Sequence, residues 1–61
     1  MPDMKHFAYA HLPLHLQEVS RPIGELAHRM NDALPDCEEK EVGLRKLLEA
    51  KDALVRARLE L

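Results

Sequence analysis

The side chains that could carry out covalent chemistry are few in this sequence. There is one serine, Ser20, and one cysteine, Cys37, and the chain has no threonine and no tryptophan. A hydrolytic site needs a nucleophile, a base and oxyanion donors around a cavity that holds the substrate. This set of residues is too small for such a site, and we therefore predict that the protein is not an enzyme and has no catalytic residues.

The sequence also contains few residues that could bind a metal ion or take part in redox chemistry. His11 and His15 have the i,i+4 spacing at which two histidines on a helix can share a metal ion, but Pro13 lies between them and no third ligand is evident. Cys37 stands beside Asp36, Glu38 and Glu39, and carboxylates do not activate a thiol. We predict no metal site and no cofactor.

Tyr9 is the residue with the clearest potential for binding. It lies outside any periodic helical pattern, so its ring must pack on something. One interpretation is a lid over the end of the helices. The other is a platform for a planar ligand such as a base, where stacking contributes about 1–3 kcal/mol per base.

The elements that must position these residues are helices. Hydrophobic residues make up 46% of the 61 residues, mostly Leu and Ala, with 33% charged and 3% aromatic residues. Leu and Ala lose little freedom in helices, so the composition predicts an all-α fold and excludes a β-sandwich. One cysteine excludes a disulfide-stapled domain, and no apolar run is long enough for a membrane span. A net charge of −2 is atypical of DNA-binding proteins, and we expect no DNA partner.

One domain, residues 1–61, accommodates an arm and two helices. Residues 1–10 show no helical period, and we expect an extended N-terminal arm. A heptad pattern then predicts a first helix over residues 12–34, formed by Leu12, Leu16, Val19, Ile23, Leu26, Met30 and Ala33. Pro22 disturbs this helix. Either the helix is kinked near residues 20–22, which the unbroken heptad phase favours, or a new helix begins with Ser20 as its cap.

Residues 35–37 form the expected turn. Asp36 and Glu39 have the spacing of a capping box, which predicts a second helix over residues 38–60. Two helices of similar length joined by a short turn form an antiparallel helical hairpin.

The second helix carries features that point to partners. Its face of small side chains, opposite the leucines, either is ordinary surface or receives another helix, and the short chain favours a homo-oligomer. That face consists of Val42, Ala50, Ala53 and Ala57. Lys51 stands among the leucines. It either reaches the rim or pairs with a carboxylate such as Glu25 or Asp32, or it meets an anionic ligand in the oligomer.

Several short segments together resemble a known family. They are residues 7–9 (Phe-Ala-Tyr), 11–13, 20–27, 34–35, 39–40 and 44–53. Together they resemble the phage anti-CBASS protein 2 family, where CBASS is cyclic-oligonucleotide-based antiphage signalling, and the resemblance extends over nearly the whole chain. The resemblance implies a helical hairpin that assembles as a hexamer in the host cell cytoplasm. It also implies that the protein sequesters host cyclic di- and trinucleotides without cleaving them.

The resemblance also implies site residues. Tyr9 would stack on a base of a cyclic dinucleotide, and the basic residue that pairs with phosphate falls at Ser20 or Arg21, with Gly24 in the same stretch. A separate trinucleotide site would use an arginine near the end of the second helix, where Arg56 and Arg58 are the nearest matches. The alternative function is a small helical adaptor that binds a protein partner through its apolar faces.

Overall fold

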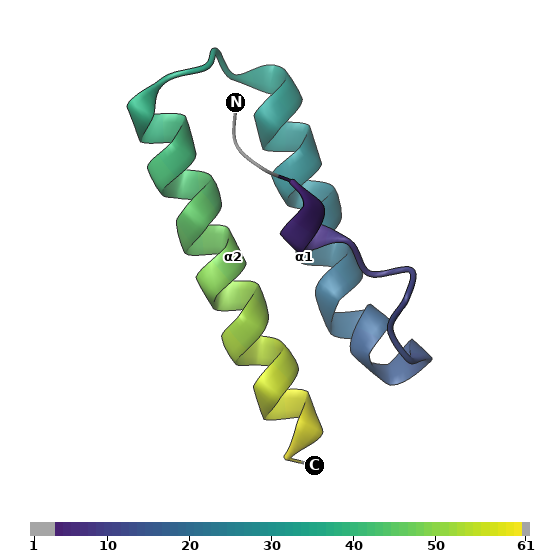
Figure 1. The fold of residues 1–61 in the computed structure, drawn as a ribbon. Coiled ribbons are helices and arrows are strands. Elements are labelled where there is room, and N and C mark those ends of the chain that lie inside the picture. Colours follow the sequence, from purple (N-terminus) through teal and green to yellow (C-terminus); the bar gives the residue numbers. More distant parts are fainter. Residues whose placement is uncertain (1–3, 61) are drawn as a thin grey trace.

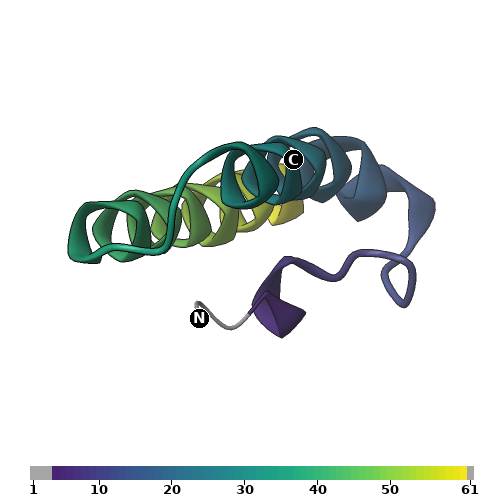
Figure 2. The same ribbon diagram turned by 90° about the horizontal axis from the view of Figure 1, so that it is seen from above.

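The computed structural model describes residues 4–60 and shows a pair of antiparallel helices (Figure 1). A 3-10 turn, η1, spans Lys5–Phe7, and the two helices are α1, Leu14–Ala33, and α2, Glu38–Leu59. No strand occurs in the described part of the chain. The all-helical fold with two packed helices is thus confirmed. Seen along the pair, the N-terminal arm lies on one face of the two helices as a separate layer (Figure 2).

The prolines define the bounds of α1. The helix begins at Leu14, two residues later than predicted, because Leu12 precedes Pro13 and a residue before proline disfavours the helical conformation. The same effect applies at Leu34, which precedes Pro35 and is extended with ψ of 147°. The helix continues through Pro22 as one element. The alternative of a separate helix that begins at Ser20 is therefore wrong, and the kink stays a prediction.

The start of α2 differs from the predicted capping box. Cys37 is the N-cap residue, and no side chain forms a capping hydrogen bond there. Asp36 was expected to cap the helix, but its carboxylate lies 2.7 Å from the Lys40 ammonium. Glu38 and Glu39 still place negative charge in the first turn, where the helix dipole favours it.

Lys40 joins the two helices at the turn. Its side chain is 4% exposed, and its ammonium donates hydrogen bonds to the carbonyl oxygens of Asn31 and Leu34, both at 3.1 Å. The last carbonyls of a helix have no partner within the helix, and a basic side chain can satisfy them. Lys40, from α2, therefore caps the C-terminal end of α1.

The core lies in the half of the hairpin nearest the turn. Phe7, Ala27 and Leu44 are buried together, and Met30 and Leu47 are among the partly buried residues packed against them. Phe7 is only 2% exposed, and the arm that carries it is folded into η1 rather than extended as expected. Burial of this large ring against α1 and α2 accounts for the difference.

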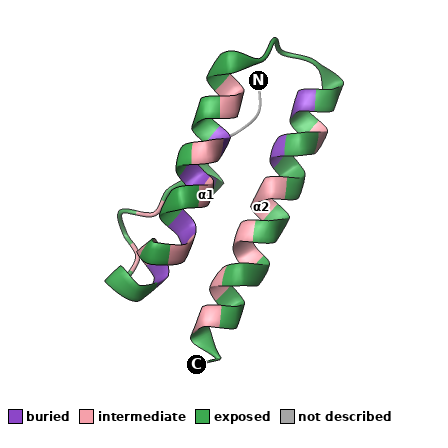
Figure 3. Ribbon diagram, turned by 180° about the vertical axis from the view of Figure 1, so that it is seen from behind, coloured by how far each residue is buried: buried purple, intermediate pink, exposed green. Residues whose placement is uncertain are grey.

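The two helices are buried to different extents along their lengths (Figure 3). On α1, four buried residues extend from Leu16 to Ala27, whereas the buried residues of α2, Lys40 and Leu44, are confined to its first seven positions. Within residues 4–60, no helix has the length and apolar character required to cross a bilayer.

Candidate functional site

Tyr9 lies on α1 at Gly24. A methyl group at Gly24 would be 2.9 Å from the carbonyl oxygen of Phe7 and 3.4 Å from Cδ1 of Tyr9. Since side chains essentially never approach a backbone oxygen so closely, the arm can follow this path only over a glycine. The Tyr9 ring therefore packs against Gly24, and it is half-buried.

Arg21 lies beside the same ring. Its Nε donates a hydrogen bond of 2.7 Å to Oε1 of Glu25, one helical turn further along α1, and both side chains are exposed. This hydrogen bond, and then the charge of Glu25, raise the pKa of Arg21 above its ordinary value, and the phenol oxygen of Tyr9 adds to the shift. The structure thus brings together three predicted site residues: Tyr9, Arg21 and Gly24.

Ser20 occupies a different environment. It is fully buried on α1, one turn before Gly24, and its Oγ has no hydrogen-bond partner within the described residues. A buried hydroxyl without a partner is unfavourable by about 1–3 kcal/mol. In the single chain, the Ser20 side chain therefore presents no surface to a ligand.

The two candidate arginines of α2 have different surroundings. Nη1 of Arg58 donates to the carbonyl oxygen of His15 and to Oε2 of Glu18, both at 3.3 Å, and so ties the end of α2 to the start of α1. Arg56 has no hydrogen bond or ion pair to any residue in the range 4–60 and is exposed. Of the two, Arg56 is the one whose guanidinium has no partner within the described residues, whereas Arg58 is held through Nη1.

A pocket of about 360 Å³ opens between the arm and the second half of α2. The sequence drew attention to Lys51 and Arg56 but not to the arm residues opposite them. The ammonium of Lys51 pairs with Asp52 at 2.8 Å rather than with Glu25 or Asp32, which were the expected partners on α1. The pocket is lined by Lys5, His6, Ala8, His11, Leu12, Lys51, Asp52, Val55 and Arg56.

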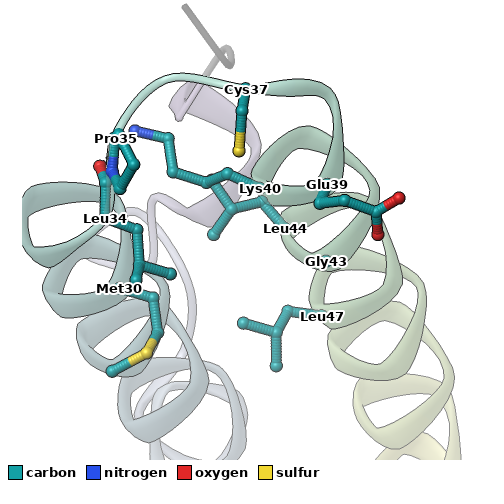
Figure 4. A pocket seen from close by; sticks show the side chains of 9 residues that line it. All are labelled: Met30, Leu34, Pro35, Cys37, Glu39, Lys40, Gly43, Leu44 and Leu47. Carbon is teal, nitrogen blue, oxygen red and sulfur yellow. Dashed lines mark hydrogen bonds between the residues drawn. The ribbon is translucent and has the colours of Figure 1, made fainter.

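A second pocket of about 360 Å³ lies at the turn between the helices (Figure 4). Its walls are mostly aliphatic, and the thiol of Cys37, a free cysteine, points into it. Apolar walls without convergent polar groups suit a hydrophobic side chain rather than a nucleotide. The lining residues are Met30, Leu34, Pro35, Cys37, Glu39, Lys40, Gly43, Leu44 and Leu47.

Metal ligands do not converge in the described part of the chain: no group of three or more His, Cys, Asp or Glu side chains there could hold an ion. Comparison with protein-family models, with curated proteins and with solved structures finds no match to this chain.

Proposed function

We propose that this protein binds cyclic oligonucleotide second messengers, cyclic dinucleotides above all, and sequesters them without cleaving them. A phage protein of this kind would act in the host cell cytoplasm and block CBASS signalling. The sequence support is the resemblance of residues 7–53 to the anti-CBASS protein 2 family. The structural support is the face that carries Tyr9 and Arg21, which we call the Tyr9 face.

The observation that carries the proposal is the pairing of an aromatic ring with a cation. The ring of Tyr9 offers a surface on which any base can stack, and Arg21 lies beside it. The Nε–H of Arg21 is used by Glu25, but a guanidinium has five N–H donors, so both terminal nitrogens remain for a phosphate. Arginine can bind phosphate through two parallel N–H···O hydrogen bonds, whereas lysine cannot form this bidentate contact.

Glu25 opposes the binding of a phosphate at Arg21. Its carboxylate, 2.7 Å from Arg21, repels a phosphate and offsets part of the guanidinium charge. A ligand with two phosphates would bind more favourably where Arg21 residues of several subunits meet. The homo-oligomer, a hexamer by resemblance, thus belongs to the proposal, and the exposed leucines at the open end of the hairpin, Leu14, Leu54 and Leu59, support it.

Calorimetry with a panel of cyclic dinucleotides tests the proposal. We expect Tyr9→Ala to weaken binding by roughly 10- to 100-fold, in line with the loss of one stacked base. Tyr9→Phe is the matched control, because it keeps the ring and removes only the oxygen beside Arg21; it should bind nearly as well as the wild type. The ligand should be recovered intact after denaturation of the complex.

The panel also separates the proposal from its alternative. A folded oligomer that binds no cyclic dinucleotide, or a Tyr9→Ala variant with wild-type affinity, would contradict the sequestration function. The function would then pass to a helical adaptor. That alternative is favoured by one observation, the aliphatic pocket at the turn, which is open to solvent and suited to a partner's hydrophobic side chain (Figure 4).

A further inference from the structure

The pocket between the arm and α2 concentrates positive charge in a chain whose net charge is −2. Its ionisable residues come from both elements: Lys5, His6, His11, Lys51, Asp52 and Arg56. With both histidines neutral, three cations and one carboxylate give the lining a formal charge of +2. Two imidazoles add further N–H donors. Charge of one sign, focused in a concave site, attracts ions of the opposite sign.

The cations contributed by α2 retain unused hydrogen-bond donors. Arg56 has no partner within the described residues, whereas Arg58, two positions later, is held by Glu18 and His15. The side chain of Lys51 is 13% exposed, and its only partner in residues 4–60 is the carboxylate of Asp52. An ammonium has three donors and is unfavourable in a partly buried place unless they are satisfied. Both groups therefore have the capacity to bind an anion from solution.

We propose that this pocket, which we call the arm pocket, binds a small phosphorylated anion with two or more negative charges. Arg56 and Lys51 would contact the anion from α2 and Lys5 from the arm. A volume of about 360 Å³ lies within the range of small-molecule sites, and Val55 and Leu12 supply apolar surface beside the cations. Guanidinium and ammonium groups form strong, charge-assisted hydrogen bonds to phosphate oxygens.

The arm pocket is separate from the Tyr9 face. It shares no residue with Tyr9, Arg21 or Gly24, and it lies between the arm and α2 rather than between the arm and α1. The inference therefore does not rest on the proposed function. Because the ligand would bridge two elements, it would also hold the arm against α2, and its binding would stabilise the folded arm by mass action.

Titration calorimetry of the full chain with inorganic pyrophosphate and with ADP, at low salt, tests the inference. We expect Arg56→Gln to weaken pyrophosphate binding by about tenfold or more, because a charge-assisted hydrogen bond is lost. Arg45→Gln is the matched control, since Arg45 is exposed on the same helix and lies outside the arm pocket. It removes the same charge from α2 and should leave the affinity within about twofold of the wild type.

Lys5→Gln tests the proposed contact from the arm independently. Helix content measured by circular dichroism shows whether each variant is folded. Tighter binding of ADP would assign the site to nucleotides, and equal binding would assign it to free phosphate anions; both support the arm pocket. Two outcomes would overturn it. One is a wild-type chain that binds neither anion, and the other is equal weakening by Arg56→Gln and Arg45→Gln.

Discussion

The two halves of the hairpin differ in how completely a single chain buries them. In the turn half, residues 24–33 and 38–48, Ala27 and Leu44 are buried with Phe7, and Lys40 closes the end of α1. In the open half, residues 14–23 and 49–59, α2 has no buried residue within the described chain. Three leucines of the open half are well exposed, at 51% for Leu54, 60% for Leu59 and 78% for Leu14, whereas Leu16 of α1 is buried.

The core that stabilises the fold is therefore in the turn half, and the candidate ligand sites lie mainly toward the open half. The arm pocket lies in the open half, where α2 contributes Lys51, Asp52 and Arg56. The Tyr9 face lies near the junction of the halves, at Arg21 and Gly24. Ligand sites commonly occupy the less stable parts of a protein, while a compact core holds them in place. The exposed leucines remain available for the predicted contact between subunits.

Removing one leucine from each half tests this comparison most directly. Leu44→Ala should lower the free energy of unfolding by about 2–5 kcal/mol, because it removes a side chain that is 4% exposed from the core. Leu54→Ala should change the stability of the dilute protein by less than about 0.5 kcal/mol. Denaturant titration of both variants at low concentration gives the comparison.

The exposure of the open half also leads us to expect that Leu54→Ala changes how the melting temperature depends on protein concentration. If subunits meet there, the melting temperature of the wild type should rise with concentration, and Leu54→Ala should reduce that rise. Equal losses of stability for the two variants in dilute solution would contradict the division into two halves.

Sequence alone could predict the helical bounds to within about two residues, because the prolines at positions 13 and 35 restrict the residues before them. It predicted the buried face of α1 only in part, since Leu16 of the predicted heptad is buried. The predicted heptad included Val19 and Ile23, which are half-buried, whereas the neighbouring Ser20 and Gly24 are buried. The arm lies over Gly24, and the path of an arm without periodicity has no signal in the sequence.

The candidate sites show the same limit. Tyr9 stood out because its ring lies outside any periodic helical pattern, and Arg21 through the resemblance. Their proximity depends on how the arm folds back. Lys40 was missed because its role requires the end of α1 to lie within reach of α2, which only the turn geometry provides. Lys5, His6 and His11 were not linked to Lys51 and Arg56, since residues about 40 to 50 positions apart meet only in the folded chain. Basic residues in the segment that precedes the first helix were the available signal.

The two glycines of the helices have different surroundings, because Gly24 lies under the arm and Gly43 faces open space. Gly43→Ala should stabilise α2 by about 1 kcal/mol, since nothing lies within 4 Å of the new methyl group and alanine favours helices. Gly24→Ala gains the same helix propensity but forces the backbone of Phe7 away. We expect overpacking of about 1–3 kcal/mol to offset that gain and to displace the arm.

The fluorescence of Tyr9 reports the position of the arm, since the chain has no other tyrosine and no tryptophan. We expect a changed tyrosine signal with unchanged helix content in Gly24→Ala, and neither change in Gly43→Ala. A Gly24→Ala variant with wild-type fluorescence and higher stability would show that the arm does not require glycine at position 24.

The ion pair between Asp36 and Lys40 at the turn should make a small contribution to stability that depends on pH. The hydrogen bond from Lys40, and then its charge, lower the pKa of Asp36 below its ordinary value. A carboxyl whose pKa is lower in the folded state stabilises the protein fully above its unfolded pKa, near 3.9. That contribution is lost as the pH falls through the folded value. Asp36→Asn should therefore be less stable than the wild type at pH 6.

The difference between Asp36→Asn and the wild type should then shrink as the pH is lowered from 5 to 2, because a protonated Asp36 resembles asparagine. The effect should be small, since the carboxylate is exposed and water screens its interaction with Lys40. Denaturant titrations at a series of pH values measure it. NMR titration of Asp36 in Lys40→Met provides the control, since without the ammonium its pKa should return toward the ordinary value. A stability difference that stays constant down to pH 2 would mean that the ion pair contributes nothing, and that Lys40 acts at the turn only through the carbonyl oxygens of Asn31 and Leu34.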